Sequence, residues 1–237
     1  MPANQFGLAL AFLQSKPTAA ARLLEQQPAD DVAAFLSGVP RPLASGVLTQ
    51  MLPYYAARIC HELPDEISAA LLVPLNNTAI AAILRHLSPA EQKTTTHLLP
   101  EKLKLTLRII FNYAENSVGA WMIPDGPSLP IDCQLGEAIE RLARYPAESS
   151  HELIPVVDRD GKLLGEVTVH ALISNTPSVT VASIMRPADT RLRGHSNLEI
   201  ESRHPVWQNR DALPVVSRAA KLIGVLRHSD LRRGLVH

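Results

Sequence analysis

Two segments of the sequence place polar side chains at the end of an apolar run that contains a glycine. Thr168 follows Gly165 by three residues, and Arg227 follows Gly224 by three. Asp230 comes three residues later. A hydroxyl or a guanidinium can hold a phosphate, and a carboxylate accepts several hydrogen bonds. Each residue also has a structural explanation, because threonine suits a strand, aspartate suits the start of a helix, and arginine commonly lies along a surface.

No nucleophile, base and orienting group stand together at a readable spacing, so we expect that the protein is not an enzyme. The sequence has no Gly-x-Ser-x-Gly, P-loop or Gly-x-Gly-x-x-Gly pattern. Its nine histidines include no His-x-x-x-His pair and no cluster with cysteine, so no zinc site is expected. Cys60 and Cys133 lack Cys-x-x-Cys spacing and are expected to be buried thiols in a reducing cytosol.

The elements that must position these side chains form a duplicated unit. Residues 154–167 return as residues 213–226, and the shared positions include the pairs Pro155 and Pro214, Arg159 and Arg218, Lys162 and Lys221, and Gly165 and Gly224. Each copy reads as a strand, a tight hairpin and a second strand. A helix is predicted after each copy, at residues 170–174 and 229–235, and an amphipathic helix before each. Pro205 is expected to shorten or kink the second of these preceding helices.

This unit resembles a pair of CBS domains, whose copies commonly open on Met-x-Pro, here Met122-Ile-Pro124 and Met185-Arg-Pro187. The resemblance implies an adenine-nucleotide site with the motif Gly-hydrophobic-x-(Thr/Ser)-x-x-Asp, in which the hydroxyl holds a phosphate and the carboxylate accepts from the ribose. The first copy keeps only the threonine of this motif and the second only the aspartate. We therefore expect a weak or single site. Its predicted residues are Thr168, Arg227, Asp230, Val156, Val157, Val215 and Val216.

The first half of the chain is a train of short Ala- and Leu-rich helices punctuated by proline. Each proline is expected to end one helix and start the next. Ser88 and Glu91 form a predicted capping box. Helices of about ten residues are too short to be stable alone, so stacking against neighbours should stabilise them in a solenoid. The predicted helices are residues 18–27, 29–38, 43–52, 54–63, 65–73, 78–87, 91–99 and 101–113.

Residues 28–36, 52–60 and above all 112–122 (Asn-Tyr-Ala-Glu-Asn-Ser-Val-Gly-Ala-Trp-Met) resemble the cytosolic part of MgtE magnesium transporters. That family has the same order of parts, with a Tyr-x-Glu-x-x-x-Gly-x-x-Met junction before the CBS pair. The resemblance implies magnesium sensing by acidic residues, although the metal ligands stay unknown because each acid also suits a solvated helix face. The candidates are Glu62, Asp65, Glu66, Glu91, Asp125, Asp132, Glu137 and Glu140. The family's membrane domain is not expected here.

The sequence therefore predicts a multidomain α and α/β protein: an all-α MgtE N-like solenoid over residues 1–115, then a tandem CBS (Bateman) module over residues 116–237. Its two copies should span about residues 122–178 and 179–237. Equal numbers of acidic and basic residues, 23 of each, give no reason to expect nucleic acid as a partner, and no apolar run suits membrane insertion. Five arginines at residues 186–210 are expected to form a mixed-charge surface or a dimer seam.

The predicted function is that of a soluble, cytoplasmic MgtE-like regulatory sensor, with magnesium or an adenine nucleotide as its ligand. We expect a homodimer formed through the CBS helices, with the helical domain open to a protein partner. The alternative is a ligand-independent scaffold that binds a protein through its helical domain and dimerises through its CBS pair.

Overall fold

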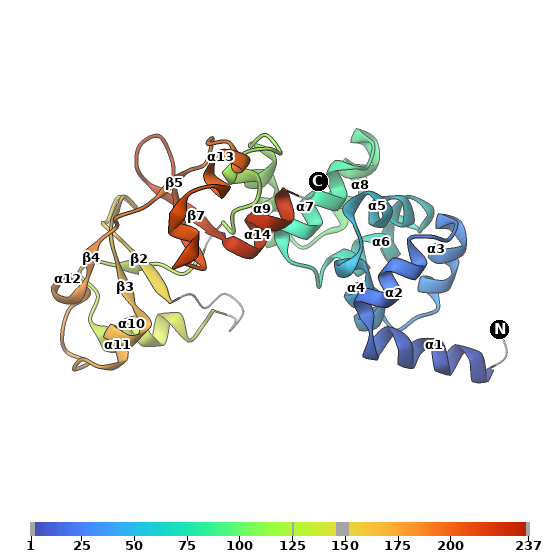
Figure 1. Cartoon of the computed structure of the whole chain (residues 1–237), viewed down its shortest axis with the longest axis horizontal. Coiled ribbons are helices and arrows are strands. Elements are labelled where there is room, and N and C mark those ends of the chain that lie inside the picture. The colour runs from blue at the N-terminus through green and yellow to red at the C-terminus, as the bar shows by residue number, and fades with distance from the viewer. Residues whose placement is uncertain (1–2, 125, 146–151, 236–237) are drawn as a thin grey trace. The chain divides into compact units, whose positions relative to one another are not determined.

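The computed structural model describes residues 3–124, 126–145 and 152–235 of the chain. It divides into two compact units, Met1–Arg108 and Ile109–His237. The first contains helices only, drawn from blue to green in Figure 1, and the second contains two small sheets with short helices. Within the described ranges, no helix is long and apolar enough to cross a bilayer.

The helices of the first unit are short, as the proline spacing predicted. They are α1 (Ala3–Ser15), α2 (Pro17–Leu24), α3 (Ala29–Ser37), α4 (Arg41–Gln50), α5 (Pro53–Glu62), α6 (Asp65–Leu72), α7 (Asn77–Arg85), α8 (Pro89–Leu98) and α9 (Glu101–Phe111). The division between the units falls within α9. The first of them, α1, had no counterpart among the predicted helices.

Proline sets most of these helix starts. Pro53 and Pro89 lie in the first turn of their helices, where a missing N–H costs nothing, and Pro28 is the N-cap of α3. The predicted capping box of α8 is present. The expectation was wrong at Pro74: α7 begins three residues later, because the Asn76 side chain caps it by accepting a hydrogen bond from the Ala79 N–H at 2.8 Å.

Helices α2 to α8 pack mainly against the helix two places along the chain. The packed pairs are α2 with α4, α3 with α5, α4 with α6, α5 with α7 and α6 with α8. The buried Ser45 hydroxyl strengthens one pair by donating to the Leu71 carbonyl at 2.8 Å, from α4 to α6. All residues of α7 from Thr78 to Leu84 are buried, so this helix is apolar on every side. The predicted solenoid packing is confirmed.

The second unit contains the predicted duplication. The first sheet has the order β1-β2-β3-β4, and the second has the order β5-β6-β7. Its strands are β1 (Leu129–Pro130), β2 (Leu153–Val157), β3 (Leu163–Thr168), β4 (Arg186–Pro187), β5 (Leu192–Arg193), β6 (Ala212–Val216) and β7 (Leu222–Arg227). Its helices are η1 (Val118–Ala120), α10 (Leu135–Leu142), α11 (Val169–Ile173), α12 (Val181–Ile184), α13 (Leu198–Ser202), η3 (Pro205–Gln208) and α14 (His228–Gly234). Helix α13 ends at Ser202, before Pro205, as expected.

The two hairpins have the same register. Pro155 pairs with Glu166 and Val156 with Gly165 in the first copy, as Pro214 pairs with Val225 and Val215 with Gly224 in the second, and both hairpins carry an irregularity at the next position. The tips of the hairpins also pair with each other. The Leu163 N–H donates to the Ala220 carbonyl at 3.1 Å, and the Leu222 N–H donates to the Gly161 carbonyl at 2.8 Å. Because these two bonds are equivalent by the sequence offset, a local twofold relates the copies.

The copies also exchange their opening segments. Met185-Arg186-Pro187, which opens the second copy, supplies β4 to the first sheet, where Pro187 pairs with Gly165. In the opposite direction, Ile123 of the first copy forms two backbone hydrogen bonds with Val225 of the second sheet, at 2.7 and 3.0 Å. Each Met-x-Pro segment therefore completes the sheet of the other copy, which explains why the pair forms one compact unit.

The junction motif is held by an aromatic ring between two glycines. A Cβ on Gly119 would lie 2.4 Å from the Tyr113 ring, and one on Gly194 would lie 2.8 Å from it. The buried Trp121 ring donates from Nε1 to the Glu115 carbonyl at 2.7 Å. The motif therefore fixes the start of the second unit, since any side chain at Gly119 would displace the tyrosine.

Candidate functional site

The two copies place different chemistry at the end of their second strands. In the first copy Thr168 is the N-cap of α11, and its Oγ1 accepts a hydrogen bond from the Ala171 N–H at 3.0 Å. In the second copy Arg227 occupies the N-cap position of α14 without capping it through its side chain. Asp230 lies in the first turn of that helix with an exposure of 1%.

Arg227 and Asp230 are partners rather than two independent binding groups. Arg227 donates from Nε to Asp230 Oδ2 at 2.6 Å, and Arg233 lies 3.7 Å from Asp230 Oδ1. The pairing satisfies a buried carboxylate that would otherwise be costly. A ribose hydroxyl that donates to Asp230 would have to compete with Arg227 for Oδ2. Once displaced, the Arg227 guanidinium could contact a phosphate of the same ligand.

The first copy contains a buried ion pair on its second strand that the sequence did not predict. Glu166 lies two residues before Thr168, at the position where the CBS motif has a hydrophobic residue. Its carboxylate accepts two hydrogen bonds from the Arg210 guanidinium, at 2.7 and 2.8 Å, and its side chain is 6% exposed. The carboxylate raises the pKa of Arg210, so the guanidinium stays charged. The sequence did contain a signal for this ion pair, because Glu166 directly follows Gly165 at a motif position that is normally hydrophobic.

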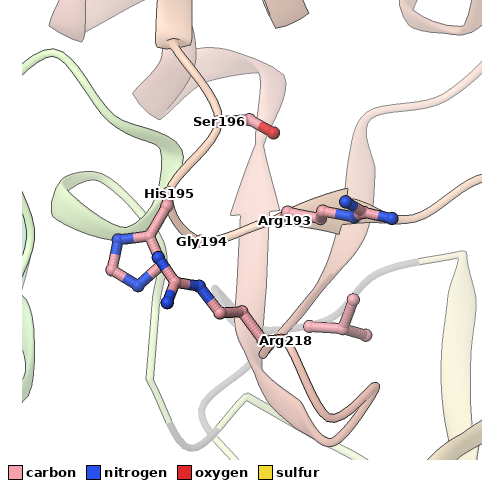
Figure 2. Close-up of a pocket in the computed structure, with 6 residues that line it drawn as sticks. Arg193, Gly194, His195, Ser196 and Arg218 are labelled. Carbon is pink, nitrogen blue, oxygen red and sulfur yellow. The ribbon is translucent and has the colours of Figure 1, made fainter.

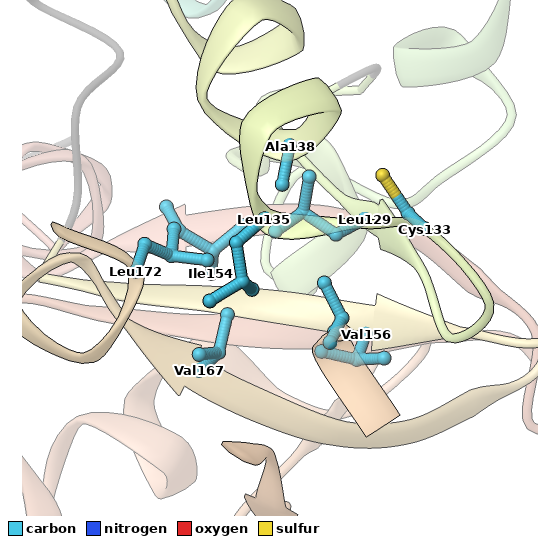
Figure 3. Close-up of a cluster of buried hydrophobic side chains, with 9 residues drawn as sticks. Leu129, Cys133, Leu135, Ala138, Ile154, Val156, Val167 and Leu172 are labelled. Atoms are coloured by element: carbon cyan, nitrogen blue, oxygen red, sulfur yellow. The ribbon is translucent and has the colours of Figure 1, made fainter. Parts of the chain in front are cut away.

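The four predicted valines do not share one environment. Val216 is buried and lines a pocket of about 220 Å³ with Arg193, Gly194, His195, Ser196 and Arg218 (Figure 2). Val156 belongs to the buried core cluster of the first copy, which also contains Ile154, Val167 and Leu172 (Figure 3). Val215 is equally buried, and Val157 is partly exposed. The structure therefore brings Arg227 and Asp230 together, but it does not join the valines into one surface.

Three of the magnesium candidates are engaged in ion pairs. Glu91 belongs to the α8 capping box and pairs with His61, and hydrogen bonds from Ser88 and His61 lower its pKa to about 2. Glu62 and Glu91 line a pocket of about 160 Å³ in the first unit. In the second unit Asp132 pairs with Arg159 at 3.1 Å and Glu137 with Arg141 at 2.8 Å.

The remaining acids that the structure describes do not form a cluster. Asp65 and Glu66 lie in the first turn of α6, Glu140 is exposed on α10, and Asp125 lies outside the described residues. Among the residues that the structure describes, no group of three or more His, Cys, Asp or Glu side chains could hold a metal ion. Both cysteines are free and buried, as expected, and burial raises the pKa of the Cys60 thiol to about 11.

Comparison with known proteins identifies both parts of the chain. Residues 15–116 match the family model of the MgtE intracellular N domain, and residues 118–177 match that of the CBS domain. The chain carries an MgtE intracellular N domain and a CBS domain. The second sheet repeats the strand order and register of the first, so the MgtE N domain is followed by a CBS pair.

Relatives of known name support this arrangement. The magnesium transporter MgtE of Thermus thermophilus is 28% identical over 120 residues, which are 50% of this chain and 27% of that protein. The match therefore spans about a quarter of the transporter's length. The fold is similar to that of the cytosolic domain of the Mg²⁺ channel MgtE in complex with ATP, with a TM-score of 0.82 and 24% identity over 94% of this chain and 92% of that one. A second structure, the soluble part of a magnesium transporter, has a TM-score of 0.69 and 16% identity over 98% of this chain and 97% of that one.

Proposed function

We propose that this MgtE-like chain is a non-catalytic regulator of magnesium transport whose CBS pair responds to an adenine nucleotide. The observation that carries the proposal is the likeness in fold, over 94% of the chain, to an MgtE cytosolic domain in complex with ATP. A local twofold with two strand-to-helix ends suits a module that binds a ligand between its copies and changes their arrangement.

The nucleotide is assigned to the second copy. There Asp230 can accept from the ribose hydroxyls, and Arg227, which now pairs with Asp230, can contact a phosphate. In the first copy the buried pair of Glu166 and Arg210 takes the place of an apolar wall. One site per CBS pair is therefore expected, and its affinity should be weak because binding must break the Arg227 to Asp230 contact.

Calorimetric titration of the full chain with ATP, ADP and AMP tests this assignment. Asp230→Asn should lower nucleotide affinity by about tenfold or more, since it removes the charged acceptor. Asp160→Asn, which removes an equal charge from an exposed hairpin turn, should leave the affinity unchanged. Absence of heat and of any shift in melting temperature with all three nucleotides at millimolar concentration would refute the proposal.

Magnesium is the competing ligand. The paired acids of the second unit argue for weak binding, because a cation would have to displace Arg159 or Arg141. X-ray scattering with and without magnesium at about 10 mM, a level suited to a weak hard-cation site, separates the two ligands. A change with magnesium alone, together with no response to nucleotides, would transfer the sensing role to the cation.

An interaction scaffold is the second candidate function. Ile173 on α11 and Ile200 on α13 are 67% and 71% exposed, which favours a protein contact through the CBS helices. We propose that these helices form the homodimer. Light scattering that gives a dimer mass, no ligand effect and a stoichiometric protein partner would favour the scaffold over the sensor. A monomer mass at micromolar concentration would remove the homodimer.

A further inference from the structure

The pocket beside Val216 is basic and small. It lies where β5 and β6 end. The lining residues that the structure describes include Arg193, His195, Ser196 and Arg218, and none of them is a carboxylate. Figure 2 shows the Arg218 side chain extending toward the His195 imidazole, while Arg193 extends to the other side. Tyr113 packs against the His195 ring with a centroid distance of 4.9 Å, which helps to fix the loop that carries the imidazole.

The first CBS copy has an equivalent position at the end of its strands, with an aspartate where the second copy has His195. Pro130 pairs with Val157 in the first sheet as Arg193 pairs with Val216 in the second. Two residues beyond each pair, Asp132 and Arg159 in the first copy therefore correspond to His195 and Arg218 in the second. In the first copy the carboxylate of Asp132 accepts hydrogen bonds from Arg159 at 3.1 and 3.3 Å. In the second copy an imidazole stands where that counter-ion would be.

Among the described residues, no carboxylate balances the charge of this pocket. Two other arginines of the segment 186–210 have carboxylate partners: Arg203 pairs with Glu199 at 2.6 Å, and Arg210 pairs with Glu166. Within the described part of the chain, neither Arg193 nor Arg218 takes part in an ion pair. Two guanidinium groups that line one pocket concentrate positive charge there, which favours the binding of an anion.

We propose that this pocket binds a phosphate group. A guanidinium fork matches the geometry of phosphate oxygens, the Ser196 hydroxyl can donate a further hydrogen bond, and the imidazole can donate as well. The volume of about 220 Å³ is below the roughly 300 Å³ at which pockets for drug-sized ligands begin. The pocket therefore suits orthophosphate, pyrophosphate or the phosphate end of a larger molecule. It is separate from the nucleotide site proposed at Asp230, and neither proposal depends on the other.

Titration of the full chain with pyrophosphate, followed by calorimetry, tests the pocket. The wild type should bind pyrophosphate saturably. His195→Asp should weaken binding by about tenfold or more, because the new carboxylate can pair with Arg218 as Asp132 pairs with Arg159. Arg218→Gln should produce a similar loss without introducing a negative charge. Arg159→Gln, the matched change in the first copy, should leave the affinity unchanged, and melting curves check that all variants are folded.

Two further arms separate this pocket from the nucleotide site and identify the source of the phosphate. The Asp230→Asn variant should still bind pyrophosphate. Loss of pyrophosphate binding in Asp230→Asn but not in His195→Asp would overturn the proposal. Absence of saturable binding up to about 10 mM, above the range of a weak site, would overturn it as well. In the Asp230→Asn background, displacement of pyrophosphate by ATP but not by adenosine would show that the pocket takes the phosphate end of a nucleotide. Absence of displacement by ATP would support a free phosphate.

Discussion

Thr168 shows how one side chain can serve either a helix or a ligand. Its hydroxyl oxygen accepts from the Ala171 N–H and so satisfies a donor at the start of α11. The corresponding residue Arg227 cannot cap α14 in this way and instead pairs with Asp230 in the first turn. At this scale the two copies have diverged from one motif into a cap and an ion pair.

We expect Thr168→Val to lower the free energy of unfolding by about 1 kcal/mol, the usual cost of a lost N-cap, and Thr168→Ser to restore most of it. Urea denaturation measures both changes. Nucleotide affinity should stay at the wild-type value in Thr168→Val, because the nucleotide is assigned to the second copy. A large loss of affinity with unchanged stability would show that the threonine binds the ligand instead.

At the scale of elements, the hairpins owe their common register to a common turn. Gly161 and Ala220 both adopt positive φ, at 78° and 59°, and the backbone of Asp158 and of Ser217 closes the turn onto Lys162 and Lys221. Glycine adopts this conformation without strain, whereas alanine does so at a cost. The turn therefore persists in the second copy because the pairing of the two hairpin tips stabilises it.

The buried pair of Glu166 and Arg210 offers a test of the asymmetry between the copies. Arg210→Met should lower the free energy of unfolding by about 3 kcal/mol, because it leaves a buried carboxylate without its partner. The double variant Glu166→Val with Arg210→Met should recover to within about 1 kcal/mol of the wild type, since it replaces the pair by apolar side chains.

The second copy has a valine, Val225, at the position that matches Glu166. The double variant therefore gives the first copy the residue that the second copy already has there. Chemical denaturation of the wild type, both single variants and the double variant gives the coupling energy. Equal loss in the Arg210→Met variant and in the double variant would mean that the guanidinium stabilises the fold through packing and not through the carboxylate.

At the scale of the whole molecule, the two units have separate cores and different sources of stability. The first depends on stacking of helices two places apart, and the second on two sheets that exchange their opening segments. Units of this kind need not unfold together. Scanning calorimetry should therefore resolve two transitions, which variants in each unit can assign.

The pH dependence that His61 contributes should appear in the transition of the first unit. Glu91 raises the pKa of His61 above its ordinary value of 6.5. The pair therefore stabilises the first unit fully between pH 4.5, the ordinary pKa of Glu91, and pH 6.5. This stabilisation is lost as the pH rises through the raised pKa of His61, and also as it falls toward the lowered pKa of Glu91. His61→Gln should lower that transition at pH 5.5 and have little effect at pH 9.

The transition of the second unit is the internal control, because His61 lies in the first unit. Arg210→Met should move only the second transition. A shift of both transitions by either variant would show that the two units unfold as one. Equal effects of His61→Gln at pH 5.5 and pH 9 would show that the pair with Glu91 does not stabilise the folded state.

Much of the fold followed from local patterns in the sequence. Proline spacing predicted eight of the helices of the first unit, and the repeat of residues 154–167 predicted both hairpins. The prediction was incomplete where a side chain overrode the pattern, as Asn76 did at the start of α7. The functional residues were predicted less well, because a motif position says what a residue can bind but not what it already contacts.

The sequence by itself determined the two-part architecture, the hairpin register and the positions of Thr168, Arg227 and Asp230, because these depend on residue type and spacing along the chain. Only the tertiary structure decided that Arg210 reaches Glu166 from 44 residues away, and that Arg218 has an imidazole where Arg159 has a carboxylate. The physical reason is that charge pairing acts between residues that folding brings close, and a linear sequence does not contain that distance.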